Sequence, residues 1–156
     1  MKPKFTSSDA WLLLAVALAS CRQDAPGKGG ATLKDVIAAG DVIQHAIFTP
    51  AELRRGFAKL IAAGHVQADG ERFSLVGAAS AEYEHIKRSA MTLWKQLEAM
   101  EAFLSAARYP AGDPNYEDPD WPYPALSDEV IEAACKARHN EAERLGCEIG
   151  EDFKGT

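Results

Sequence analysis

The sequence feature that most constrains the fold is an uninterrupted run of nine apolar residues, WLLLAVALA, at positions 11–19. The run is well short of the ~20 residues that cross a bilayer. A helix that is apolar on every face is typical of one buried on all sides. Ser7, Ser8 and Asp9 precede the run, and these residue types favour the N-cap and first turn of a helix. We therefore expect a buried first helix over about 9–21, capped by Ser7 or Ser8.

The end of the same run permits a second interpretation. Lys2 and Lys4, a short apolar segment and the sequence LASC (Leu18–Cys21) together fit a signal peptide that ends in a lipid-anchored cysteine. Asp9 is unfavourable in such a signal, and cleavage before Cys21 would remove the first helix of the domain. We therefore expect a cytoplasmic protein with no membrane partner, and a secreted lipoprotein processed at Cys21 is the less favoured alternative.

The length and charge of the chain set further bounds. A chain of 156 residues fits one ordinary domain, or a small domain with an extension. Residues 1–78 hold nine basic and seven acidic side chains, a balance of +2, whereas residues 79–156 hold eight and sixteen, a balance of −8. Such a split suggests different roles for the two halves. The three cysteines contain no C-x-x-C pair, which argues against a disulfide framework and a structural zinc site.

Two further helices are predicted by capping residues and apolar spacing. Thr32 precedes a series of apolar residues spaced three or four positions apart, which predicts a second helix with Thr32 as its N-cap. The negative charge of Asp35 in the first turn is favourable to the helix dipole. The segment TPAE at 49–52 combines an N-cap Thr, a Pro at the first helical position and a Glu at the third, which is a capping box. Gly64 is expected to end this third helix, over 50–63. Its apolar stripe comprises Leu53, Phe57, Leu60 and Ile61.

A hairpin is predicted after the third helix. In HVQADGERFSLV, residues 65–76, two short segments flank Asp69 and Gly70, a pair typical of tight turns. The order helix, helix, capped helix, strand, turn, strand resembles the winged helix-turn-helix superfamily over about residues 8–78. The resemblance rests on FTPAEL at 48–53, on Leu60 through Val66, and on ADGERFSL at 68–75. It implies a mainly α fold with a small β wing.

Winged helices bind either DNA or protein. The resemblance implies that a DNA-binding member places its third helix in the major groove. We expect Arg55 and Lys59, one turn apart, on the side of helix 50–63 that lies opposite its apolar stripe. Arg suits bidentate contacts to guanine and Lys suits phosphate. The candidate DNA-binding residues are Arg54, Arg55 and Lys59 of this helix, Arg72 in the 66–76 wing, and Lys34 at the start of the second helix.

Residues 80–108 are predicted to form one long amphipathic helix, because apolar residues recur at alternating steps of three and four for more than three heptads. This segment resembles the trailing dimerisation helix of PadR-like regulators, which implies a homodimer through residues 80–108. The residues expected in the dimer contact are Tyr83, Ile86, Leu93, Leu97, Met100 and Leu104.

The last part of the chain changes character. Residues 109–126, YPAGDPNYEDPDWPYPAL, contain five of the eight prolines together with aromatic and acidic side chains. We expect this strap to lie against a surface and to be the contact if the partner is a protein. A final helix is expected over about 128–145, with Ser127 as N-cap and Gly146 as its end. The predicted parts are a winged-helix-like domain (1–78), the long helix (79–108), and the strap with the final helix (109–156).

Other chemistry has less support in the sequence. Cys135 and His139 have a spacing that can hold a metal, but no second pair accompanies them. The GKGG segment at 27–30 lacks the full phosphate-loop pattern. We find no catalytic triad and no dinucleotide fingerprint, so we expect no enzyme activity, no cofactor and no metal site. The favoured function is a dimeric transcriptional regulator that binds double-stranded DNA with helix 50–63 and the 66–76 wing. The alternative is a winged-helix protein-interaction module.

Overall fold

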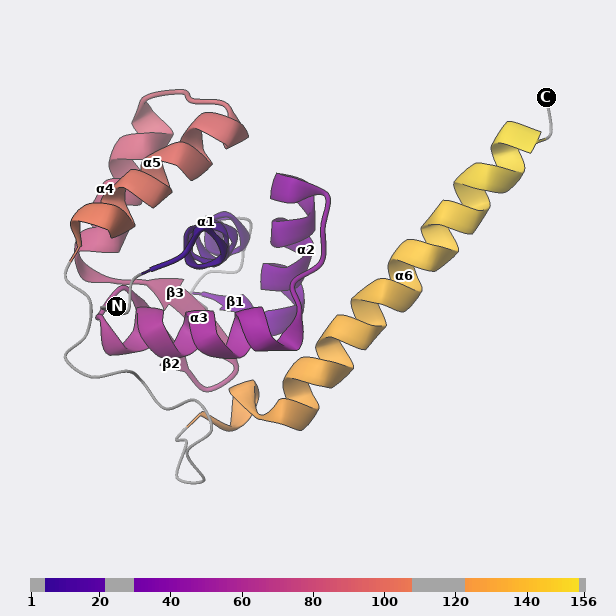
Figure 1. Cartoon of the computed structure of the whole chain (residues 1–156), viewed down its shortest axis with the longest axis horizontal. Coiled ribbons are helices and arrows are strands. Elements are labelled where there is room, and N and C mark those ends of the chain that lie inside the picture. The colour runs from indigo at the N-terminus through magenta and orange to yellow at the C-terminus, as the bar shows by residue number, and fades with distance from the viewer. Residues whose placement is uncertain (1–4, 22–29, 108–122, 155–156) are drawn as a thin grey trace.

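The computed structural model describes residues 5–21, 30–107 and 123–154, with side chains described up to residue 144. In chain order the elements are α1 (Ser7–Cys21), β1 (Ala31–Thr32), α2 (Leu33–Gln44), α3 (Pro50–Ala62), β2 (Val66–Asp69), β3 (Arg72–Leu75), α4 (Gly77–Arg88), α5 (Leu93–Ala106), the short 3-10 helix η1 (Pro124–Leu126) and α6 (Asp128–Lys154). Figure 1 shows α1 end-on in the middle of the body, flanked by α2 on one side and by α4 and α5 on the other. Helix α3 and a small sheet lie below it. The prediction of a mainly α chain with a small β element is confirmed.

Helix α1 is the centre of the core, as its apolar sequence predicted. Every residue from Ala10 to Val16 is at most 5% exposed, and α1 contacts α2, α3, α5 and β3. A position with protein on every side requires a uniformly apolar helix. The capping residue differs from the prediction, which named Ser7 or Ser8. Thr6 caps α1 instead, because its Oγ1 accepts from the Asp9 backbone N–H at 3.3 Å and its own N–H donates to Asp9 Oδ2 at 2.7 Å.

Helix α2 begins where the sequence predicted. The Thr32 hydroxyl oxygen accepts from the Asp35 N–H at 3.3 Å, and the Asp35 carboxylate accepts from the Thr32 N–H at 3.3 Å. Gly40 lies on the buried face of α2, and a Cβ built there would lie 2.3 Å from Cε2 of Phe48. The ring of Phe48 stacks on Trp11 with centroids 3.8 Å apart, and Trp11 Nε1 donates to the Gly40 carbonyl at 2.9 Å. The glycine thus permits the contact between α1, α2 and the chain segment before α3.

The sheet has one strand more than the hairpin that the sequence predicted. Strands β2 and β3 pair antiparallel around Gly70, whose φ of 61° is favoured in glycine. Strand β1 pairs antiparallel with the other edge of β3, which gives the order β1-β3-β2. A strand of two residues is too short to show an alternating pattern, so β1 could not be predicted from the sequence. It places the start of α2 directly beside the hairpin.

The single long helix predicted over 80–108 is wrong, because this segment forms two helices. Helix α4 ends before Ser89, Ala90 adopts a left-handed φ of 50°, and Thr92 caps α5 by accepting from the Lys95 N–H at 3.3 Å. Helix α5 then turns back to pack on α1 and α4. The heptad-like spacing therefore reflects burial against the chain's own first helix.

Helix α6 starts as predicted, with the Ser127 hydroxyl accepting from the Val130 N–H at 3.3 Å. It continues through Gly146, where the sequence predicted its end, to Lys154. A glycine inside a helix costs only about 1 kcal/mol, which does not enforce a stop. The first half of α6 packs on α2 and α3, and Figure 1 shows the second half extending beyond the body. The predicted strap falls mostly on residues 108–122, which lie outside the described residues.

Candidate nucleic-acid interface

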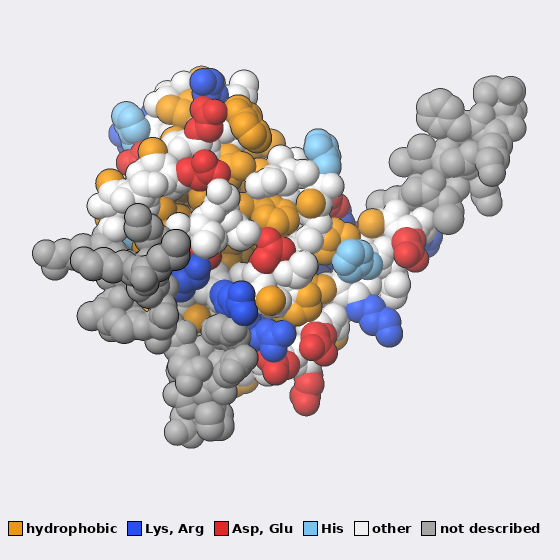
Figure 2. Space-filling view, viewed as in Figure 1, with side chains coloured by type: hydrophobic (Ala, Val, Ile, Leu, Met, Phe, Trp, Pro, Cys, Tyr) orange, Lys and Arg blue, Asp and Glu red, His pale blue; other side chains and the backbone are white. Residues whose placement is uncertain are grey.

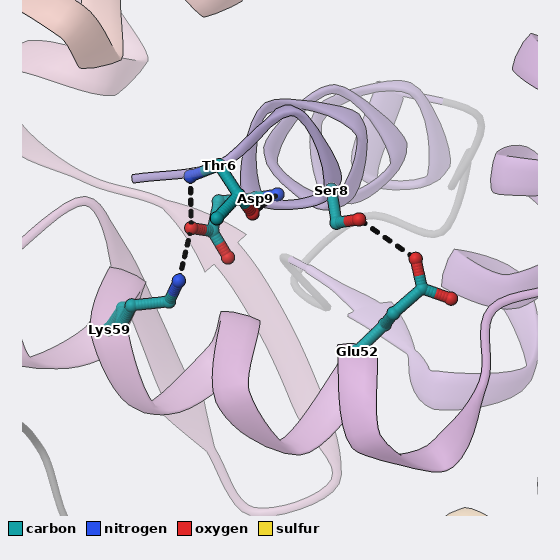
Figure 3. A network of polar contacts seen from close by, with 5 residues as sticks. All are labelled: Thr6, Ser8, Asp9, Glu52 and Lys59. Carbon is teal, nitrogen blue, oxygen red and sulfur yellow. Dashed lines mark hydrogen bonds and ion pairs between the residues drawn. The ribbon is translucent and has the colours of Figure 1, made fainter. Parts of the chain in front are cut away.

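The N-terminus of α3, the helix predicted to enter the DNA groove, is held by several side-chain hydrogen bonds. Thr49 Oγ1 accepts from the Glu52 N–H at 3.2 Å, and the Glu52 carboxylate accepts from the Thr49 N–H at 3.0 Å. The Ser8 hydroxyl donates to the other Glu52 oxygen at 2.8 Å (Figure 3). Burial raises the pKa of Glu52, but the hydrogen bonds from Thr49 and Ser8 outweigh it and hold that pKa below its usual value. The start of α3 is therefore fixed to its own cap and to α1.

Lys59 was predicted to lie on the outward face of α3, but its side chain is mostly buried against α1. Its Nζ lies 2.5 Å from Oδ2 of Asp9, and the side chains are 14% and 3% exposed. Asp9 Oδ2 also accepts from the Thr6 N–H (Figure 3). The ammonium group therefore neutralises a buried carboxylate at the N-terminus of α1. Lys59 joins α3 to α1, and a groove contact is not its main role in this arrangement.

Arg54 lies beside α6, a neighbour that the sequence did not predict. Its Nη1 forms an ion pair with Oδ1 of Asp128, the first residue of α6, and the arginine side chain is 23% exposed. Its Nε is buried and has no hydrogen-bond partner among the described residues. The guanidinium is thus held through one of its two donor edges.

Arg55 is exposed on α3, as predicted for the outward face. Ala51 and Ala62, on the same side of the helix, are exposed as well, whereas Ala58 is only 3% exposed. Figure 2 shows a short row of Lys and Arg side chains across α3, bordered by acidic side chains where α6 begins. The cations of α3 are Arg54, Arg55 and Lys59.

The other two candidate cations lie outside α3, on α2 and on β3. Lys34 is exposed in the first turn of α2. Arg72 begins β3, and its Nη1 donates to the Gly30 carbonyl at 3.1 Å, which fastens the hairpin to the strand before α2. Lys34 also borders a hollow of 460 Å³ between α2, the hairpin turn, η1 and α6, with Glu71 among its other lining residues. This hollow is lined mainly by apolar side chains, among them Leu33, Pro124, Val130 and Ala134.

The residues predicted to form the dimer contact are mostly buried within the chain. Leu93 is partly buried, and the other five are at most 6% exposed. These five are Tyr83, Ile86, Leu97, Met100 and Leu104. They belong to the same core cluster as α1. In this conformation a second copy of the chain would have to bind elsewhere, and the homodimer itself stays a prediction.

His65 is a buried polar residue whose setting the sequence did not reveal. It is 7% exposed, and its ring lies 6.0 Å from Phe5 and 5.1 Å from Phe103, centroid to centroid. Neither ring nitrogen has a hydrogen-bond partner among the described residues. Burial lowers the pKa of His65, so the neutral imidazole is favoured in this aromatic pocket.

The Cys135 and His139 pair does not form a metal site in the described part of the chain. Cys135 is 4% exposed and its thiol donates to the Phe48 carbonyl at 3.4 Å, whereas His139 is exposed. Burial and the nearby Glu132 carboxylate raise the pKa of the Cys135 thiol, which disfavours the thiolate that binds metal. No group of three or more His, Cys, Asp or Glu side chains suited to a metal ion occurs among the described residues.

Comparisons of the chain with protein-family models, with curated proteins and with solved structures found no match. Within the described ranges, no helix combines the length and apolar composition needed to cross a membrane.

Proposed function

We propose that this chain is a non-catalytic winged-helix protein that binds double-stranded DNA, and that it acts as a transcriptional regulator. The observation that carries the proposal is the row of cationic side chains on α3 (Figure 2). A helix that carries a row of Arg and Lys side chains fits the size and charge of the DNA major groove, and Arg55 is the cation of α3 that is exposed. The contacts assigned to DNA are Arg54, Arg55, Lys34 and Arg72, whereas Lys59 chiefly maintains the fold.

The arrangement around α3 supports the proposal. The order α1, β1, α2, α3, β2, β3 contains the helix, helix, capped helix and hairpin on which the winged helix-turn-helix resemblance rests. Lys34 comes from the start of α2, and Arg72 comes from the hairpin, whose strand β2 contacts α3. A dimeric regulator would double the number of phosphate contacts. Its dimer contact would use surfaces other than the buried side chains of α4 and α5.

The test compares two single-charge variants of the full-length chain. Arg55→Ala removes a cation from α3, and Lys95→Ala removes one from α5, where Lys95 is 67% exposed and paired with Glu98. Fluorescence anisotropy of a labelled duplex at low salt should show affinity reduced about five- to tenfold by Arg55→Ala and nearly unchanged by Lys95→Ala. Absence of duplex binding by the wild type, or equal loss in both variants, would contradict the proposal.

A protein-interaction module is the second candidate, and one observation favours it. Trp94 in the first turn of α5 is 66% exposed, and aromatic side chains are enriched in protein interfaces. Under this alternative, Trp94→Ser should weaken capture of a partner protein, whereas Arg55→Ala should not. A partner retained equally by wild type and Trp94→Ser would remove the support that Trp94 gives to this candidate.

We propose a cytoplasmic location, because α1 forms the centre of the core and processing before Cys21 would remove it. The lipoprotein alternative makes an opposite and simple prediction for the mature chain. An intact mass that corresponds to a chain beginning at Met1 supports the proposal. An acylated chain that begins at Cys21 would overturn it.

A further inference from the structure

We propose that α6 restrains α3 by an internal competition: Asp128 occupies Arg54 in the free protein, and a DNA phosphate replaces Asp128 on binding. The inference rests on the proposed DNA-binding function and adds a mechanism that limits it. It begins from the placement of α6, whose first half lies against α2 and the N-terminal end of α3 (Figure 1). In helix-turn-helix recognition, the N-terminal residues of the recognition helix are those that contact base edges.

The start of α6 is strongly acidic and lies at this end of α3. Asp128, Glu129 and Glu132 fall in its first two turns, and all three are exposed. Figure 2 shows acidic side chains next to the basic row of α3 at this place. Asp128 makes the ion pair with Arg54, and its carboxylate therefore occupies a donor that a phosphate oxygen would need.

The ion pair between Arg54 and Asp128 is suited to exchange. Asp128 is 67% exposed, so solvent screens the pair and its opening costs little. The carboxylate uses only Nη1, and Nε of Arg54 is buried without a partner among the described residues. A phosphate oxygen can accept a charge-assisted hydrogen bond from the same Nη1 that Asp128 occupies. Phosphate can therefore replace Asp128 at Nη1, one anion for another.

The rest of α6 is anchored, which keeps Asp128 in place until a competitor arrives. Ile131 is 0% exposed and Cys135 is 4% exposed. Arg138 Nη2 forms an ion pair with Asp41 Oδ2 of α2 at 2.6 Å. An anchored helix that presents an exposed acidic end holds its carboxylate at high effective concentration beside Arg54. The restraint thus needs movement of the Asp128 side chain only, and the fold stays intact.

The test is a double-mutant cycle on duplex binding by the full-length protein at low salt. Asp128→Asn removes the competing charge and keeps the size of the side chain, and we expect about two- to fivefold tighter binding. Glu129→Gln is the matched control, because it removes the same charge one residue away and Glu129 makes no ion pair with the described residues. In an Arg54→Ala background, Asp128→Asn should bring no gain.

Each outcome bears on the inference. Equal gains from Asp128→Asn and Glu129→Gln would show only the long-range effect of charge and would overturn it. A gain that persists in Arg54→Ala would overturn it as well. If the wild type binds duplex DNA, Arg55→Ala binds it more weakly and Asp128→Asn binds it no more tightly, the proposed function stands and the restraint is refuted. No duplex binding by any of these proteins would overturn both.

Discussion

The buried ion pair between Lys59 and Asp9 gives the sharpest prediction on stability. Lys59→Met keeps much of the length and apolar stem of the side chain but leaves the Asp9 carboxylate, 3% exposed, without its cation. The Thr6 N–H at 2.7 Å remains as a hydrogen-bond donor. Breaking a buried ion pair from one side costs about 3–5 kcal/mol. Because Lys59 is itself 14% exposed, we expect the lower end, a loss of about 3 kcal/mol in the free energy of unfolding.

The control and the reverse substitution sharpen this prediction. Lys95→Met breaks an exposed pair with Glu98 and should cost at most about 0.5 kcal/mol. Asp9→Asn should cost less than Lys59→Met, because the lysine left behind can extend its ammonium group to solvent. In the double variant the two losses should fall short of additivity by about 1–3 kcal/mol, since both act on one contact.

Urea unfolding followed by circular dichroism measures the free energy of unfolding of the wild type and of the four variants. A Lys59→Met variant within about 0.5 kcal/mol of the wild type, or one no less stable than Lys95→Met, would refute the placement of Lys59 in the fold. Strict additivity in the double variant would refute the pairing with Asp9. The stability of Lys59→Met also shows whether a Lys59 variant that fails to bind DNA has lost its fold or has lost a contact to DNA.

Three further predictions concern stability. Gly40→Ala should cost about 1–3 kcal/mol by urea unfolding, because its Cβ would lie 2.3 Å from the buried ring of Phe48; an unchanged midpoint would contradict that contact. Thr49→Ala removes the cap of α3 and should cost about 1 kcal/mol, whereas no loss would mean that the cap is not needed. His65 has a pKa lowered by burial, so its protonation favours the unfolded chain, and stability should fall as pH decreases from about 8 through the usual histidine range near 6.5. His65→Phe should remove that part of the pH dependence, and an identical pH profile in both proteins would contradict the assignment.

The parts of the fold that are set by local chemistry were predictable from the sequence. Thr32 and Thr49 mark the starts of α2 and α3 with side chains that satisfy free backbone N–H groups, and both capping interactions are present. The apolar run of α1 predicted a helix enclosed by protein. Gly70 placed the turn of the hairpin. In each case a neighbour a few residues away, or the absence of any polar face, carries the information.

The parts that depend on distant contacts were not predictable in the same way. The spacing of Leu97, Met100 and Leu104 is the same for a helix that packs on a second chain and for one that packs on α1. Lys59 has the exposed-looking spacing of a groove contact, but its partner Asp9 lies 50 residues away in sequence. Arg54 likewise meets Asp128 of a helix that begins 74 residues later. Residue spacing placed Arg55 on the exposed side of α3, but it did not reveal the contacts of Arg54 and Lys59.

The proposed contacts between the cations on and around α3 and the phosphates of duplex DNA should make binding depend strongly on salt concentration. Wild-type protein titrated into labelled duplex at salt concentrations from about 50 mM to about 200 mM should lose affinity steadily, with a logarithmic slope of roughly −2 to −4 for two to four phosphate contacts per chain. Binding that is absent at the lowest salt, or that does not change across this range, would contradict the proposed contacts.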